Sequence, residues 1–139
     1  MGSCTMLTPA TRKHIFISHA WKYNVDYYTI LRWLDESLIV YHNYSVPEHD
    51  PLDAGNTRKL KTALTEQMRH ANIVIIIAGM YANHSDWIQY EIDEAVRMGK
   101  KIIAIKPRGN IYLPLAVQKA ANKIVAWNRN SLLEAIRTI

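Results

Sequence analysis

The stretch IVIIIAGMYANHSDWIQYE, which runs from Ile73 to Glu91, decides the fold of this chain. Its first six residues form an unbroken apolar run rich in isoleucine, which is typical of a strand buried on both faces of a sheet. Gly79 ends this run, and a polar loop is expected to follow it. Ser85 or Asp86 would then cap the next helix.

This next helix is expected to carry one apolar stripe with a carboxylate at its border. The stripe consists of residues at helical spacing: Ile88, Ile92, Ala95 and Val96. Glu91 falls at the edge of the stripe, and Trp87 lies one turn earlier on the same side. A carboxylate beside an indole, just past the end of a strand, is a candidate functional group.

Strand and helix alternate five times along the chain with short connections. The expected strands are residues 14–17, 44–46, 73–78, 101–105 and 124–126, and the expected helices are residues 24–38, 56–71, 86–98, 114–121 and 130–139. This alternation gives right-handed crossovers and a parallel sheet that is covered on both faces. We therefore predict an α/β fold, a flavodoxin-like three-layer sandwich whose five-stranded parallel sheet has the order 2-1-3-4-5.

This strand order places a crevice between the carboxyl ends of the first and third strands, where ligands bind in such folds. The two loops that meet there are residues 18–23 and 79–86. The helix that carries Glu91 is expected to begin at the same crevice, so topology and local sequence indicate the same site.

Composition sets the class of protein. The chain has 139 residues, a net charge of +5 and 49% hydrophobic residues, which fits a single globular domain at 14–139 after a flexible leader at 1–13. There is no long basic run, so a nucleic-acid partner is not favoured. The single cysteine, Cys4, excludes an internal disulfide and fits a reducing cytoplasm, and no apolar run is long enough to indicate a membrane partner.

Several familiar sites of this architecture are missing from the sequence. No GxGxxG follows the first strand, and no GxxxxGK[ST] occurs, so the glycine-based nucleotide cradles are excluded. A phospho-acceptor receiver would need carboxylates where Ser18-His19 and Gly79-Met80 stand. The six histidines are scattered without an HxxxH or HExxH pair, so no metal site is predicted.

Three segments together resemble the TIR domain family. HIFISHAW at 14–21 is similar to the first strand of that family and its following loop, and GKKIIAIKP at 99–107 is similar to the fourth strand. SDWIQYEIDEA at 85–95 is similar to the motif in which a Trp precedes the catalytic Glu by four positions. The likeness extends from about residue 13 to the C-terminus, and it is greatest to the short TIR-like group that includes the TIR subunit of bacterial Thoeris anti-phage systems. Ile88 replaces a frequent cysteine, and the 47–55 loop differs from the usual BB loop.

The resemblance implies an enzyme, an NAD glycohydrolase or cyclase that splits the bond between nicotinamide and ribose, with NAD as substrate and no cofactor. Glu91 would be catalytic, orienting the ribose hydroxyls and stabilising the oxocarbenium charge. The implied substrate-binding residues are Ser18, His19, Trp21, Ser85 and Trp87. Trp87 would form a wall of the nicotinamide subsite, and amides at the start of the 24–38 helix would receive a phosphate.

Each of these residues also has a plainer interpretation. Glu91 would be a solvated helix residue, Trp87 a packing residue, and Ser18 a group that satisfies backbone atoms at the end of a strand. As an enzyme, the protein would act in antiviral defence by sending a nucleotide signal to an effector protein, and it would self-associate through the 47–55 loop. The alternatives are a TIR-like module that assembles without chemistry and a plain nucleotide-binding domain.

Overall fold

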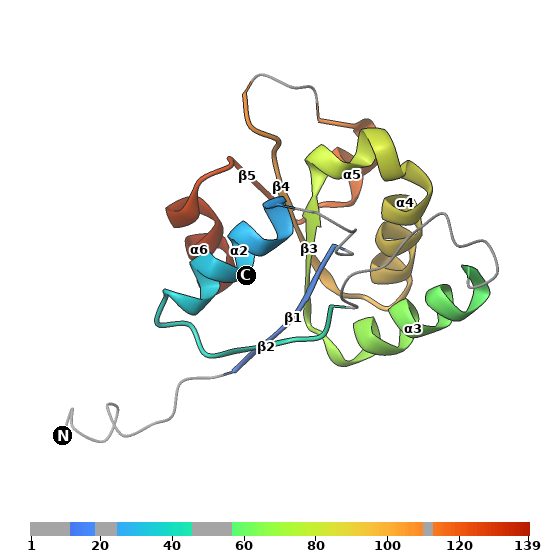
Figure 1. The fold of residues 1–139 in the computed structure, drawn as a ribbon, viewed down its shortest axis with the longest axis horizontal. Helices are drawn as coiled ribbons and strands as arrows, with labels where there is room; N and C mark the ends of the chain where they lie inside the picture. The colour runs from blue at the N-terminus through green and yellow to red at the C-terminus, as the bar shows by residue number, and fades with distance from the viewer. Residues whose placement is uncertain (1–11, 19–24, 46–56, 110–112) are drawn as a thin grey trace.

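Five parallel strands form one sheet in the computed structural model, in the order β2-β1-β3-β4-β5 (Figure 1). The structure describes residues 12–18, 25–45, 57–109 and 113–139, with the backbone alone for 57 and 80–84. The strands are β1 (Lys13–Ile17), β2 (Tyr41–Asn43), β3 (Ile73–Ile77), β4 (Lys101–Ile105) and β5 (Lys123–Val125). The flavodoxin-like α/β fold predicted from the sequence is confirmed, with β3 in the centre.

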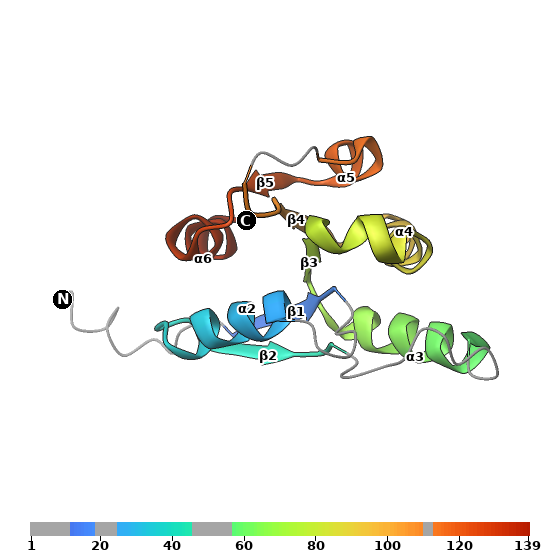
Figure 2. The same cartoon turned by 45° about the horizontal axis from the view of Figure 1, so that its top comes forward.

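Helices cover both faces of the sheet, as Figure 2 shows. The described helices are α2 (Val25–Asp35), α3 (Thr57–His70), α4 (Tyr81–Arg97), α5 (Leu115–Ala120) and α6 (Arg129–Thr138), and a 3₁₀ turn, η2 (Ala78–Met80), precedes α4. One buried cluster joins α2 and α6 to the sheet, and a second joins α3, α4 and α5 to its other face. The result is a three-layer sandwich.

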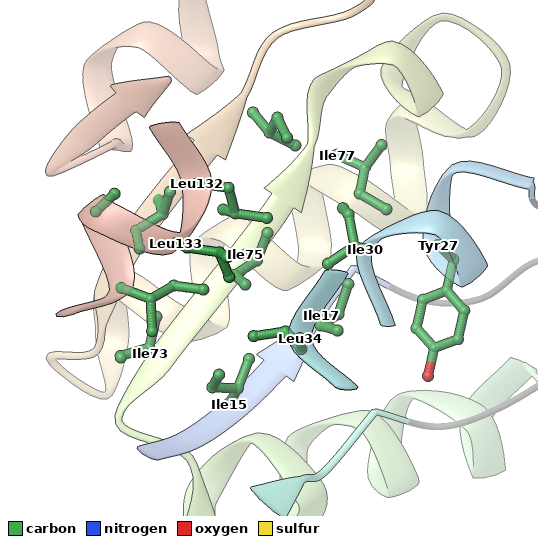
Figure 3. Close-up of a cluster of buried hydrophobic side chains, with 14 residues drawn as sticks. Ile15, Ile17, Tyr27, Ile30, Leu34, Ile73, Ile75, Ile77, Leu132 and Leu133 are labelled. Carbon is green, nitrogen blue, oxygen red and sulfur yellow. The ribbon is translucent and has the colours of Figure 1, made fainter. Parts of the chain in front are cut away.

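Alternate residues of each central strand serve the two layers of helices. Figure 3 shows Ile15 and Ile17 of β1 and Ile75 of β3 in the cluster that also contains Ile30 of α2 and Leu132 of α6. The residues between them belong to the second cluster. Because all five residues of β3 are buried, the apolar run that predicts this strand has no polar interruption, and each isoleucine stabilises the fold by about 1.5–3 kcal/mol.

The first described helix, α2, is shorter than the sequence predicted, and it buries a different face. In the sequence, apolar residues recur at helical spacing, Val25, Tyr28, Leu31, Leu34 and Leu38, and this spacing predicted the buried face. Leu38 is, however, 95% exposed and Val25 is 67% exposed. The buried residues are Tyr27, Thr29, Ile30 and Leu34. The Ser37 hydroxyl donates to the Leu34 carbonyl at 2.7 Å, which satisfies a carbonyl of the last turn and ends the helix at Asp35.

The edge strand β2 covers Tyr41–Asn43, whereas the sequence analysis predicted it three residues further along the chain, at 44–46. It pairs with β1 through the register His14↔His42. Its residues are half-buried or exposed, so no apolar run indicated it. The next residues still contact β1, since the Tyr44 amide donates to the Ile15 carbonyl at 2.8 Å.

The helix that carries Glu91 begins earlier than expected. The sequence predicted a polar loop from Gly79 and a helix capped by Ser85 or Asp86, whereas α4 starts at Tyr81 directly after η2. Asn, His, Ser and Asp are weak helix formers, but their propensities differ from alanine by less than about 1 kcal/mol, and packing of the helix overrides them. Val96, assigned to the apolar stripe, is 58% exposed.

The remaining boundaries shift by one or two residues. β1 begins at Lys13, inside the expected leader, and β5 covers Lys123–Val125 in place of 124–126. Asn128, rather than Asn130, caps α6, and its side chain accepts a hydrogen bond from the Ser131 amide at 3.1 Å. Among the described residues, no helix combines the length and the apolarity that a membrane crossing requires.

Candidate functional site

β1 and β3 pair in parallel up to their carboxyl ends, where the topology predicts a crevice. The Ser18 amide donates to the Ile75 carbonyl at 2.7 Å. The Ser18 hydroxyl donates to the same carbonyl at 3.0 Å and accepts from the Ile77 amide at 2.8 Å. Ser18 is fully buried, so its hydroxyl joins the carboxyl ends of these two strands. This is the plainer of the two interpretations that its position in the sequence allowed.

A second serine, Ser45, makes hydrogen bonds to the backbone at the carboxyl end of β1. The Ser45 hydroxyl accepts from the Ile17 amide at 2.8 Å and donates to the Ile17 carbonyl at 3.1 Å. Side-chain hydroxyls therefore replace ladder hydrogen bonds on both sides of β1, where regular pairing stops. Ser45 could not be identified from the sequence, because its partner Ile17 is 28 positions away.

Glu91 is 0% exposed in α4, the helix that follows the central strand. Its neighbours on the same helical face, Ile88, Ile92 and Ala95, belong to the apolar cluster under α4. The expected position at the edge of the stripe is wrong, because the side chain lies fully within the buried face. It takes part in a further polar interaction, as a buried carboxylate requires.

Trp87 lies one turn before Glu91 and is half-buried. It packs against the buried cluster that includes Ile88 and Ile92. Part of the indole is therefore a packing surface and part is accessible, which is the usual situation of an amphipathic ring at the rim of a site.

A polar network joins α3 to α4, the helix that carries Glu91. Thr65 of α3 contacts the Tyr90 hydroxyl at 2.5 Å and donates to Glu94 at 2.8 Å. Arg97 donates twice to Glu94, each time at 2.8 Å. The network fixes the helix that carries Glu91 against its neighbour. Only the Glu94–Arg97 spacing is visible in the sequence, since Thr65 and Tyr90 are 25 positions apart.

This network changes the acidity of Glu94. The hydrogen bonds from Arg97 are the main cause, and with those from Thr65 and Tyr90 they lower the pKa of Glu94 from its ordinary value of 4.5 to about 2. Burial acts in the opposite direction but is the weaker effect.

The other site residues from the sequence are placed as follows. Ser85 is exposed within α4 and does not cap the helix. His19, Trp21 and the 47–55 loop lie outside the described residues. The first turn of α2, proposed as a phosphate site, carries Asp26, whose carboxylate lies 3.2 Å from Arg108. Arg108 was not singled out by the sequence.

No three His, Cys, Asp or Glu side chains in the described ranges are arranged so that they could hold a metal ion. The described part of α4 offers one fully buried carboxylate, Glu91, one turn after the half-buried indole of Trp87. A carboxylate of this kind can hold hydroxyl groups and stabilise positive charge that develops on a sugar.

Comparisons with known proteins agree with this architecture. The family model described as "Thoeris protein ThsB, TIR-like domain" matches residues 16–111. Among solved structures, the chain is similar to a CMP N-glycosidase from Clostridium botulinum, BcmB, with a TM-score of 0.54 and 16% sequence identity. This similarity covers 91% of the chain and 100% of the glycosidase, and it shows a shared fold. No curated protein sequence matches the chain.

Proposed function

Since this chain belongs to the TIR-like domain family of the Thoeris protein ThsB, we propose that it is a glycosidase that cleaves NAD between nicotinamide and ribose. The observation that carries the proposal is the complete burial of Glu91 in the helix after the central strand. A solvated helix residue, the plainer interpretation, would be exposed. Charge interacts more strongly at such an enclosed position than in water, which supports a chemical role for this carboxylate.

The proposed reaction needs only one carboxylate. The nicotinamide ring is cationic in NAD and leaves as a neutral molecule. The bond from ribose C1′ to the ring nitrogen breaks, and its electron pair stays on that nitrogen. No general acid is needed, unlike in ordinary glycoside hydrolysis, where a second carboxyl group protonates the leaving oxygen. Glu91 stabilises the oxocarbenium charge, and this attraction is stronger at a buried position than in water.

An oxygen or nitrogen nucleophile then captures C1′. Water gives ADP-ribose and one proton, whereas a group of the same molecule gives a cyclic product and releases its own proton. Trp87 forms one wall of the nicotinamide subsite with its accessible edge. His19, Trp21 and Ser85 complete the proposed substrate contacts. The product acts as a signal on an effector protein in antiviral defence, as the Thoeris family assignment suggests.

The decisive experiment measures release of nicotinamide from NAD by the purified protein and by Glu91→Gln. The substitution keeps the shape of the side chain and removes its charge, so we expect turnover to fall by at least about 100-fold. The variant should still fold, because glutamine has nearly the same size and shape as glutamate, and circular dichroism checks this. Asp93→Asn is the matched control, since Asp93 is an exposed carboxylate on the same helix, and its activity should equal that of the parent.

The outcomes separate the proposal from its alternatives. A glutamine variant that releases nicotinamide at the parent rate removes Glu91 from the mechanism. Absence of turnover in every variant favours the assembly module without chemistry. Release of cytosine from CMP should be measured in parallel, because the structural neighbour is a CMP N-glycosidase. Cleavage of CMP but not of NAD would show that the protein is a glycosidase with a different substrate from the one proposed.

A further inference from the structure

A pocket lies at the carboxyl ends of β4 and β5. Its volume is about 300 Å³, and it is lined by Lys106, Pro107, Arg108, Gly109, Ala126 and Trp127. This volume is at the lower end of the range for pockets that bind small molecules. The proposed chemistry at Glu91 uses none of these residues.

The backbone of the pocket is fixed by the sheet. The Lys106 amide donates to the Val125 carbonyl at 2.8 Å, which continues the pairing of β4 with β5 up to the pocket. A Cβ atom on Gly79 would lie 3.5 Å from that of Pro107, so the ends of β3 and β4 are also in contact. Gly109 has a φ of +77°, which lets the chain turn at the rim.

The lining residues combine positive charge with flat surfaces. Lys106 and Arg108 are both cationic, and none of the six described lining residues is acidic. The Arg108 guanidinium lies 4.9 Å from the centroid of the Trp127 ring, and Trp33 contacts the same indole at 5.0 Å between centroids. A planar guanidinium on an indole offers a surface on which a base can stack, and it also donates to a phosphate.

One carboxylate competes for this arginine. Asp26 Oδ1 lies 3.2 Å from Arg108 Nη2, with side chains that are 29% and 57% exposed. An ion pair this exposed to water is weak, so an arriving phosphate can replace the carboxylate at little cost. Asp26 still repels the phosphate afterwards, because it remains nearby.

We propose that this pocket binds a nucleoside monophosphate. The phosphate contacts Lys106 and Arg108, and the base stacks on the Arg108–Trp127 pair. The proposal stands apart from the glycosidase function, because it concerns other residues and requires no turnover. It also gives a role to Arg108 and Trp127, which the proposed reaction does not use.

The test is a calorimetric titration of the full chain with AMP, with adenosine and inorganic phosphate as separate probes. We expect saturable binding of AMP, and weaker binding of each fragment. Lys106→Gln and Arg108→Gln should each weaken AMP binding by about tenfold or more. Arg108→Lys keeps the charge and loses the plane, so it should weaken AMP binding much more than phosphate binding.

The Asp26 variant gives an effect of the opposite sign. Asp26→Asn removes the competing charge, so AMP should bind several-fold more tightly, whereas Lys59→Gln, at an exposed position in α3, should leave the affinity unchanged. Equal affinity for AMP and adenosine would overturn the phosphate contact, and equal affinity for AMP and phosphate would overturn base stacking. If the substitutions at Lys106, Arg108 and Asp26 leave the affinity for AMP unchanged, AMP binds elsewhere and the proposed site is wrong. The absence of saturable binding would also overturn the proposal.

Discussion

Ser18 and Glu91 are both fully enclosed polar side chains, but the structure gives them different surroundings. Ser18 makes hydrogen bonds to two backbone groups of β3, and these account for its position without a ligand. Glu91 lies on the face of α4 whose apolar residues belong to the core, and it follows Trp87 by four positions. At the scale of the residue, we therefore assign the strand junction to Ser18 and the proposed chemistry to Glu91.

Replacing Ser18 tests the junction. Ser18→Ala leaves the Ile77 amide without its buried acceptor and removes one donor from the Ile75 carbonyl. We expect a loss of about 1–3 kcal/mol in the free energy of unfolding, measured by urea denaturation. Ser85→Ala, at an exposed site, is the control and should change stability by less than about 0.5 kcal/mol. A Ser18→Ala protein as stable as its parent would show that the junction contributes nothing.

The sequence could indicate Glu91 but could not show its burial. Its spacing from Trp87 and its place after the apolar strand are local features, and these singled it out. Whether it faces solvent or the sheet depends on the rotation of α4 by a fraction of a turn, which is set by contacts with α3 and the strands. Periodicity placed it at the border between the two faces, where such a rotation decides the outcome.

At the scale of the element, strands were predicted well where both faces are buried. β3 and β4 match the expected ranges within one residue, because an apolar run has only one interpretation there. β2 was misplaced because an edge strand that is half exposed has no such run. The start of α4 was misplaced because its first residues resemble a loop by local propensity, which is a weak indicator of structure.

The α3–α4 network should make stability depend on acid pH. The pKa of Glu94 is lowered in the folded state from 4.5 to about 2, so its stabilising effect is complete above about pH 4.5. The effect is lost as the pH falls toward 2. We expect the free energy of unfolding to fall over this range more steeply in the parent than in Glu94→Gln. Urea denaturation at a series of pH values measures the difference.

Glu134→Gln is the matched control for this series. Its carboxylate also faces an arginine three positions away, but it is 69% exposed and the separation is 3.9 Å. The free energy of unfolding of Glu134→Gln should therefore depend on pH in the same way as that of the parent. Parallel curves for the parent and Glu94→Gln would show that the network does not stabilise the ionised carboxylate.

At the scale of the whole molecule, the sheet order could be predicted because right-handed crossovers leave few arrangements for five alternating units. Assembly could not be predicted in this way. The 47–55 loop, for which we keep the hypothesis of self-association, leads directly into α3, and α3 is joined to α4 through Thr65. A neighbouring subunit placed over the crevice would exclude water from the bond that breaks.

This hypothesis predicts that catalysis depends on protein concentration. Nicotinamide release per molecule should rise with concentration until assembly is complete, because only assembled sites exclude water. The measurement is specific activity over at least a hundredfold range of concentration, with mass determined by light scattering in the same samples. If specific activity is constant across this range, the hypothesis of a site shared between subunits is wrong, whereas the proposed role of Glu91 is unaffected.

The hydrogen bonds of Ser18 also determine when the carboxyl ends of β1 and β3 can be joined. They join residues 57 and 59 positions apart, so α2, β2 and α3 must all be spanned before they close. During synthesis, a chain that has just left the ribosome as far as α3 can pair β1 with β2, but the inner edge of β1 still lacks its neighbour. Such an edge is open to strands of other chains until β3 emerges. A pause in translation while the chain has emerged only as far as α3 would therefore expose this nascent protein to aggregation.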